Sequence, residues 1–355
     1  GFTMSNSFQR IGFVLIVLVL GATMAFATGE AEGSTRELPP GPPFASAAQP
    51  GDSGEVEPIA VSDEPIRIAV IGLENNPFWI PVREGAEAAD AELEAFNGSV
   101  DWIVPPGDAH TADVFGNTIE AAITQQYDAI ATIAGDSGIV PYINRAVEAG
   151  IPVATFNVET DAENDRLFFV GADLYRQGLA AGEAMVNFFE EGGNDSPKIA
   201  VMTGFFSVEG HELRRLGFEE YVTENAPGLE IVGRVETEDS DANAYQLAQD
   251  FLTANPDLDG MYVAAGGNVG AARAVEDAGL AGEVFIFAYD FVDQTMEMVR
   301  KGIIAGTIGQ QPFAQGHDPA IRLFNYLVSG EVPEAGRMLT RSDFVTAENM
   351  EDFGF

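Results

Sequence analysis

Short runs of apolar, often β-branched residues alternate with longer amphipathic segments over most of this chain. In the first half these runs predict strands at residues 66–71, 100–104, 129–133, 153–156 and 167–170, with helices beginning near Phe78, Thr111 and Ile139. The same unit recurs in the second half, with strands at 198–202, 229–235, 260–263, 284–288 and 304–308. Such alternation is typical of parallel sheets with helical crossovers. It predicts an α/β protein made of two doubly wound, Rossmann-like lobes.

The first 27 residues do not follow this alternation. Arg10 precedes an apolar run at residues 11–20, which is shorter than the roughly 20 residues that a membrane-spanning helix needs. Ala25-Phe26-Ala27 has the small-x-small pattern of a signal-peptidase site. We therefore expect a signal peptide at 1–27 that is cleaved after Ala27, with Met4 as a candidate start residue. An uncleaved N-terminal anchor is the alternative.

The next segment, residues 28–65, is rich in Gly, Pro, Ala, Ser and Glu and has no sustained apolar period. Such segments bury too little apolar surface to offset the entropy of ordering. We expect a disordered, acidic linker that ends where the first predicted strand begins.

The absence of cysteine and the net charge exclude several classes of function. The 355 residues include no cysteine, which excludes disulfides, Cys-ligated zinc and a lipid-modified cysteine. Together with the signal peptide, this predicts a periplasmic protein that is not a Cys-anchored lipoprotein. The formal net charge of −39 excludes nucleic acid as a partner. Because the acidic residues are scattered along the chain, we interpret them as a solvated surface adapted to a salty environment.

Polar residues follow most of the predicted strands, where open parallel sheets bind their ligands. The loop after residues 66–71 holds Asn76, Phe78 and Trp79, which combine aromatic faces for sugar C–H groups with an amide for hydroxyls. Further strand ends supply Asp136, Asn157, Asn268, Asp290 and Gln310. For the aromatic residues the alternative is a place in the core. For each Asp or Asn the alternative is a helix N-cap.

Several motifs occur in an order that resembles one known family. They are Asn75-Asn76-Pro77-Phe78-Trp79, Val170-Gly171-Ala172-Asp173, residues 210–218 with Arg214, residues 250–256, Tyr289-Asp290 and residues 306–312. Over residues 66–345 the chain resembles type I periplasmic solute-binding proteins of the ribose and galactose type, which share their fold with the effector domains of LacI-type repressors. The resemblance implies ligand contacts from Asn76, Phe78, Trp79, Arg214, Asn268, Asp290 and Gln310. For Arg214 the alternative is a surface ion pair with Glu209 or Glu212.

The resemblance also implies an N-terminal lobe at 66–172 plus 311–340 and a C-terminal lobe at 173–310 plus 341–355. Three crossings, near 171–173, 310–312 and 340–342, would form the hinge. Two departures concern the ligand. Asn157-Val158 stands where ribose-type proteins have Asp-Arg, and the aromatic residue expected near Asp239 is missing. We therefore expect a ligand other than ribose in the ribose pose.

These observations favour the periplasmic binding component of an ABC-type importer, a monomer that closes on a monosaccharide or similar polyol and docks on a membrane permease. Cyclitols, nucleosides, furanosyl signals and a chemoreceptor partner remain alternatives, as does a secreted glycoside hydrolase. A transcriptional repressor would need an N-terminal DNA-binding helix-turn-helix and a basic face. The corresponding region here is the predicted signal peptide and acidic linker, which excludes that function. We expect no cofactor and no metal, because His110, His211 and His317 lack partners at metal-ligand spacing. The run Gly266-Gly267-Asn268-Val269-Gly270 lacks the spacing of a phosphate-binding loop.

Overall fold

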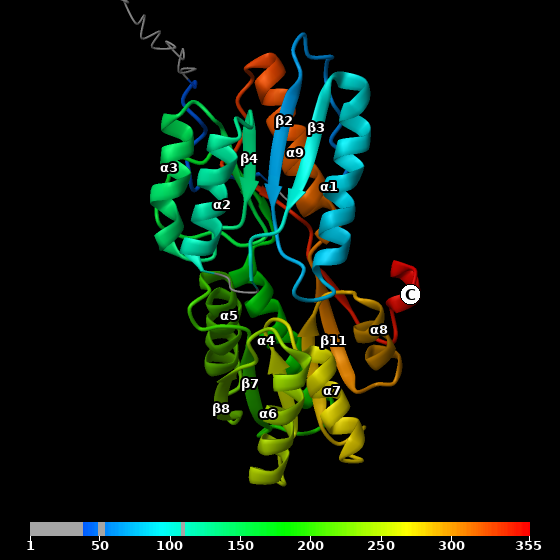
Figure 1. Cartoon of the computed structure of the whole chain (residues 1–355). Helices are drawn as coiled ribbons and strands as arrows, with labels where there is room; N and C mark the ends of the chain where they lie inside the picture. The colour runs from blue at the N-terminus through cyan, green and yellow to red at the C-terminus, as the bar shows by residue number, and fades with distance from the viewer. Residues whose placement is uncertain (1–37, 49–53, 108–110) are drawn as a thin grey trace, which may run out of the picture. The chain divides into compact units, whose positions relative to one another are not determined.

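Two parallel-sheet α/β lobes make up the part of the chain that the computed structural model describes, residues 38–48, 54–107 and 111–355, which belong to one compact unit (Figure 1). The predicted signal peptide and its cleavage site lie outside these residues, as does His110. Within the same residues, no helix has the length and apolarity to cross a bilayer.

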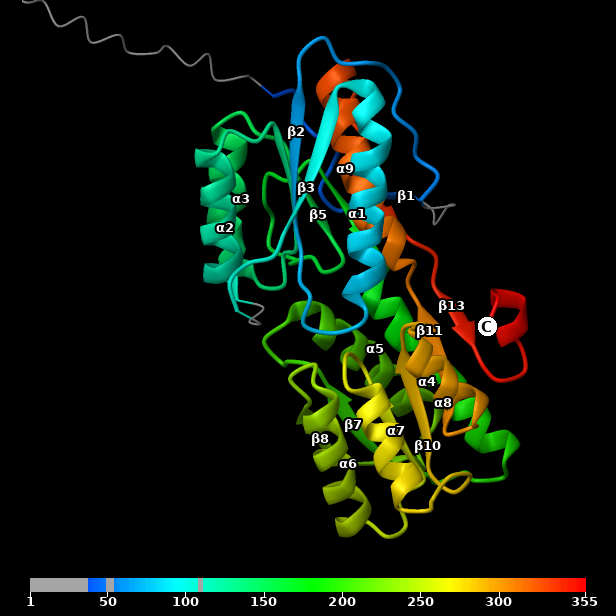
Figure 2. The ribbon, with the colours of Figure 1, turned by 45° about the vertical axis from the view of Figure 1, so that its right-hand side comes forward.

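The N-terminal lobe is built on a seven-stranded sheet, counted over the described residues, with the order β1-β12-β6-β5-β4-β2-β3. Its strands are β1 (Ala47–Ala48), β2 (Ile66–Ile71), β3 (Gly98–Ile103), β4 (Ala129–Thr132), β5 (Val153–Phe156), β6 (Phe168–Gly171) and β12 (Arg337–Leu339). Helices α1 (Trp79–Leu93) and α9 (Pro312–Ser329) cover one face, and α2 (Ala112–Thr124) and α3 (Val140–Glu148) cover the other (Figure 2). Because both faces are covered, β4, β5 and β6 are buried at every position.

The C-terminal lobe has a six-stranded sheet, again over the described residues, with the order β13-β11-β10-β9-β7-β8. Its strands are β7 (Lys198–Thr203), β8 (Glu230–Glu236), β9 (Gly260–Val263), β10 (Phe285–Tyr289), β11 (Ile304–Gly309) and β13 (Asp343–Val345), the last antiparallel to β11. Its helices are α4 (Leu174–Glu191), α5 (Glu209–Asn225), α6 (Asp241–Ala254), α7 (Asn268–Asp277) and α8 (Asp293–Arg300). Short 3-10 helices lie at η1 (Glu94–Phe96), η2 (Ser137–Ile139) and η3 (Met350–Phe353).

The chain passes between the two sheets at three places. They are the connections from β6 to α4, from β11 to α9 and from β12 to β13. Hydrogen bonds join these segments. The Thr340 N–H donates to the Gly171 carbonyl at 2.9 Å, and the Arg341 N–H donates to Gln311 Oε1 at 2.7 Å. The crossings therefore form one bonded group rather than three independent linkers.

The predicted linker is more ordered than its composition suggested. Ala47 and Ala48 add a parallel strand beside β12, and the Gly54 N–H donates to the Asp318 carboxylate at 3.0 Å. The Ile59 N–H donates to Asn325 Oδ1, also at 3.0 Å. Strand pairing with β12 and side-chain acceptors from α9 therefore order parts of this segment, and the search for an apolar period does not detect such partners.

Helices α1 and α9 cross at glycines. An added Cβ on Gly316 would lie 1.8 Å from the Val82 carbonyl oxygen, and one on Gly85 would lie 2.0 Å from that of Phe313. The C-terminal lobe repeats the arrangement, because a Cβ on Gly178 of α4 would lie 2.2 Å from the Arg214 carbonyl oxygen of α5. At these glycines the two helix backbones are too close to leave room for a side chain. The close packing fixes the positions of α9 and α5, and both helices reach the site described below.

His317, buried in α9, links that helix to α1. Its Nδ1 lies 2.9 Å from Asp318 Oδ1, and its Nε2 lies 3.3 Å from Glu92 Oε1. Burial lowers the pKa of His317, but the bonds and charges of Asp318 and Glu92 outweigh it, so that the pKa is raised above 6.5.

We expect this raised pKa to make stability depend on pH. A folded-state pKa above the unfolded value contributes stability that is complete below the unfolded pKa and is lost as the pH rises through the folded pKa. Urea unfolding of wild type and His317→Gln at about pH 6 and about pH 9 measures the difference. The wild-type advantage should shrink at the higher pH, and an advantage that grows with pH would contradict the assignment.

Net charge gives a second prediction. Like charges that total −39 repel one another in the folded state, and the Debye length falls from about 10 Å at 0.1 M to about 3 Å at 1 M salt. We expect the melting temperature to rise steadily with sodium chloride over this range. Equal melting temperatures at low and molar salt would remove the interpretation of the surface as salt-adapted.

Candidate ligand-binding site

One cavity gathers most of the predicted site residues at the carboxyl ends of the parallel strands, where ligands bind in open α/β sheets. The space between its walls, including the part open to solvent, is about 480 Å³. Of the nine residues predicted, seven line it: Asn76, Phe78, Trp79, Asn157, Arg214, Asp290 and Gln310. The remaining lining residues are Val158, Leu174, His211, Asp239, Ala265 and Gly266.

Phe78 and Trp79 form the aromatic wall of this cavity. Their rings meet edge to face, with centroids 5.2 Å apart and an interplanar angle of 83°. The Phe78 N–H donates to Asn76 Oδ1 at 3.0 Å, which fixes the turn that leads into α1. Both rings are largely buried and also pack in the core. Phe78 and Trp79 therefore pack in the core and also line the cavity.

Arg214 enters the cavity from α5 and is 5% exposed. Its Nε donates to Gln177 Oε1 at 3.0 Å and its Nη1 to the Ala264 carbonyl at 3.1 Å, while the guanidinium carbon lies 3.9 Å from the centre of the Tyr289 ring. Nη2 is buried and has no hydrogen-bond partner among the described residues. A surface ion pair is not its role, because Glu212 binds Arg215 instead. The arrangement presents a fixed donor to an oxygen atom in the cavity.

A chain of side-chain amides joins the two lobes along this cavity. Asn157 Nδ2 donates to Gln315 Oε1 at 2.9 Å, and Gln315 Nε2 donates to the Gln310 carbonyl at 2.7 Å. Gln310 Nε2 in turn donates to Asp290 Oδ1 at 2.8 Å. Burial raises the pKa of Asp290, although Arg214 and Gln310 oppose the shift. Each acceptor and donor is thereby oriented before a ligand arrives.

Three of the lining residues have left-handed backbone: Asn157 at φ 64°, Asp239 at φ 54° and Asp290 at φ 72°. Side chains other than glycine rarely adopt this region, although Asn and Asp tolerate it best. Strain of this kind clusters at binding sites, where it aims side chains that regular strands would direct elsewhere.

Two predicted residues lie outside the cavity. Asp136 caps η2, accepting from the Gly138 N–H at 2.7 Å and the Ala112 N–H at 3.2 Å, and lines a separate small cavity beside α2. Asn268 begins α7, where its Nδ2 donates to the Tyr289 carbonyl at 2.7 Å and its Oδ1 accepts from the Val269 N–H. Both side chains therefore bind backbone groups. For Asp136 this is the N-cap alternative that the sequence left open, whereas Asn268 lies one residue inside α7 and its N-cap is Gly267.

His211 and Asp239 line the cavity but were not predicted. His211 Nδ1 accepts from the Phe205 N–H at 3.1 Å, and Asp239 Oδ1 accepts from the Gly266 N–H at 3.0 Å. His211 Nε2 and Asp239 Oδ2 lie 4.0 Å apart. The spacing of His211 three residues before Arg214 was an available signal, because such residues share a helix face. Over the described residues, no cluster of His, Cys, Asp and Glu is arranged to hold a metal ion.

Comparison with known proteins identifies the class. The family model described as periplasmic binding protein domain matches residues 68–331. A D-ribose/D-allose-binding protein of Pseudomonas aeruginosa is 27% identical over 77% of this chain and 86% of its own length. A xylose/arabinose-binding protein of Sulfolobus acidocaldarius is 24% identical over 78% of this chain and 70% of its own length. The chain belongs to the periplasmic binding protein family.

Solved structures give the same result for the fold. An ABC transporter solute-binding protein from Agrobacterium vitis with bound D-fucose superposes with a TM-score of 0.72 and 28% identity, over 81% of this chain and 97% of that one. A glucose-galactose binding protein from Geobacillus stearothermophilus superposes with a TM-score of 0.71 and 26% identity, over 81% and 99%. The predicted family and the predicted two-lobed fold are both confirmed.

Proposed function

We propose that this protein is the substrate-binding component of an ABC-type sugar importer and holds one monosaccharide or similar small polyol in the cavity between its lobes. The observation that carries this proposal is the pairing of an aromatic wall, Phe78 and Trp79, with the charged groups of Arg214 and Asp290 in one cavity. A pyranose or furanose ring has flat C–H faces and an edge of hydroxyls, and it needs both kinds of wall.

The polar groups divide the recognition of such a ligand between them. Arg214 Nη2 donates to a ring or hydroxyl oxygen, and the carboxylate of Asp290 accepts from hydroxyls. Discrimination follows because a ligand that lacks one hydroxyl would leave a buried group unpaired. Asn157 and Val158 supply neither a carboxylate nor a guanidinium, which supports a ligand pose different from that of ribose.

Closure of the two lobes over the ligand is the step that would lead to transport. We propose that the three crossings act as the hinge, that the lobes close over the ligand as a monomer, and that the closed form docks on a membrane permease. Export with cleavage after Ala27 would place the protein in the periplasm. A chemoreceptor would use the same closed form, and cyclitols, nucleosides and furanosyl signals share the chemistry of a hydroxylated ring.

A fluorescence titration tests this function. The chain has two tryptophans, so Trp102→Phe leaves Trp79 as the reporter of the cavity. The panel is D-xylose, L-arabinose, D-ribose, D-allose, D-galactose and D-fucose, with myo-inositol and adenosine as non-sugar probes. We expect saturable changes in Trp79 emission with one or a few sugars. Saturation by adenosine alone would move the assignment to a nucleoside, and no saturation by any probe would contradict it.

A hydrolase is tested separately, because paired carboxylates cleave glycosides and both Asp239 and Asp290 line the cavity. Incubation with aryl glycosides and disaccharides should release no product. Turnover that is abolished in Asp290→Asn would overturn the binding function in favour of catalysis.

A further inference from the structure

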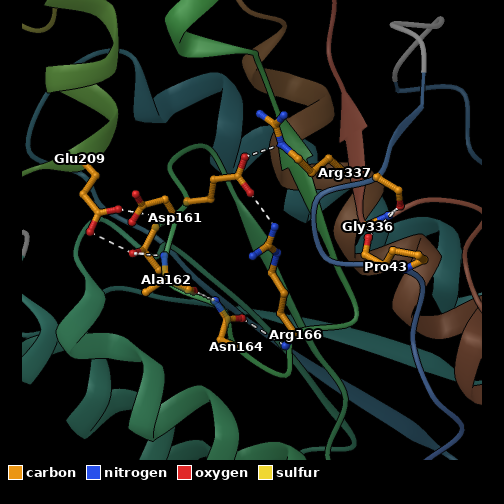
Figure 3. Close-up of polar contacts among 11 residues, drawn as sticks. Pro43, Asp161, Ala162, Asn164, Arg166, Glu209, Gly336 and Arg337 are labelled. Atoms are coloured by element: carbon orange, nitrogen blue, oxygen red, sulfur yellow. Dashed lines mark hydrogen bonds and ion pairs between the residues drawn. The ribbon is translucent and has the colours of Figure 1, made fainter. Parts of the chain in front are cut away.

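Glu209, the first residue of α5, joins the two lobes outside the ligand cavity. Its Oε1 accepts from Thr160 Oγ1 and its Oε2 from the Asp161 N–H, each at 2.9 Å. Its own N–H donates to the Gly135 carbonyl, also at 2.9 Å. Glu209 follows β7 of the C-terminal lobe, whereas Thr160, Asp161 and Gly135 lie in loops after β5 and β4 of the N-terminal lobe. One side chain thus fastens one lobe to the other (Figure 3).

Ion pairs tie the loop that Glu209 holds, residues 157–167, to the N-terminal lobe. Glu159 accepts from Arg166 Nη2 and from Arg337 Nε, each at 2.6 Å, and the Arg166 side chain is 1% exposed. Asn164 Oδ1 accepts from the Arg166 N–H at 3.2 Å. Figure 3 shows Glu209 and Arg337 reaching this loop from different elements of the chain. Because these bonds hold the loop to the N-terminal lobe, the bonds of Glu209 restrain the C-terminal lobe relative to it.

Both partners of this contact also reach the ligand cavity. The loop begins with Asn157 and Val158, which line the cavity, and α5 continues from Glu209 to His211 and Arg214, which line its other side. A Cβ added to Gly210 would lie 2.8 Å from Val158 Cγ1, so that the helix start and the loop are in close contact there. The contact at Glu209 therefore sets the spacing between these two walls of the cavity.

We propose that Glu209 sets the affinity of this protein for all its ligands alike, by stabilising the closed arrangement of the lobes without contacting the ligand. This inference rests on the proposed function as a binding protein that closes. The apparent dissociation constant equals the intrinsic one divided by the fraction of closed protein. A residue that changes only this fraction changes every apparent constant by the same factor.

The test compares Glu209→Ala, Glu209→Gln and Thr160→Val with the wild type, using the two sugars of the panel that bind most tightly. Two charge-assisted hydrogen bonds predict a Kd about 10- to 30-fold higher in Glu209→Ala for both sugars, with most of the change in the dissociation rate. Glu209→Gln keeps an acceptor and should lose less. Glu209→Ala and Thr160→Val should be less than additive in combination, since they break the same bond.

Glu224→Ala is the matched control, because it removes the same charge from an exposed position of the same helix. Its Kd values should equal those of the wild type. An unchanged Kd in Glu209→Ala, or a change that differs between the two sugars, would overturn the proposal.

Small-angle X-ray scattering of the ligand-free proteins separates this inference from the proposed function, because it needs no sugar. The radius of gyration should be larger for Glu209→Ala than for both the wild type and Glu224→Ala. A larger radius for Glu209→Ala would support the role of Glu209 even if no sugar of the panel binds, whereas equal radii together with equal Kd values would overturn it even though sugars bind.

Discussion

Arg214→Met is expected to weaken sugar binding by about 100-fold or more while leaving the protein folded. Methionine keeps an unbranched side chain against the Tyr289 ring, but it removes the donor Nη2, which has no partner among the described residues. It also leaves Asp290 without the nearby cation that opposes the rise of its pKa. Titration calorimetry with the tightest-binding sugar of the panel measures the change.

Arg215→Met provides the control for this experiment. Arg215 is the next residue of α5, yet it forms partly buried ion pairs with Glu212 and Glu219 and does not line the cavity. Its loss should leave the affinity within about twofold, since Arg215 does not line the cavity. Equal losses in the two variants would show that the charge of α5, rather than the cavity donor, governs binding.

Gly316→Ala is expected to lower the free energy of unfolding by about 3 kcal/mol or more, because overpacking at a helix crossing has no easy relaxation. The added Cβ would lie 1.8 Å from the Val82 carbonyl oxygen, so α1 and α9 would have to separate. Gln315, the neighbouring residue of α9, would move with them and lose its bond to Asn157. Affinity should therefore fall together with stability, as chemical denaturation and sugar titration of the same variant would measure.

Gly192→Ala is the matched control for that substitution. Gly192 ends α4 at φ −74°, and the nearest atom to its added Cβ would lie at 3.4 Å. We expect a change within about 0.5 kcal/mol. A Gly316→Ala variant as stable as Gly192→Ala would contradict the close crossing of α1 and α9.

The lobes were predictable from sequence because buried parallel strands are apolar on both faces. The run at 153–156 reappears unchanged as β5, and the predicted helix start near Phe78 lies one residue from that of α1. Strand ends were predictable for the same reason, since the first polar residues after such runs reach the binding edge of the sheet. Asn157, Asp290 and Gln310 were found in this way.

Other features depend on partners that a linear pattern does not contain. Asp136 and Asn268 occupy strand ends like the others, but backbone N–H groups from distant or following residues take their oxygens. The segment before β2 is ordered by pairing with β12. In this pairing Ala47 lies beside Arg337, which is almost 300 residues away in the sequence. His211 and Asp239 belong to the site through the path of α5 and a left-handed residue, which sequence spacing alone indicates weakly.

A thermal-shift screen of the chain from Thr28 onward, in high-salt buffer against the full panel, tests most directly whether this protein binds a small polyol in its cavity. Selective binding to the folded state raises the melting temperature by mass action. Our account predicts a clear rise with one or a few sugars that disappears in Arg214→Met. No rise with any sugar or cyclitol, or a rise that persists in Arg214→Met, would contradict it.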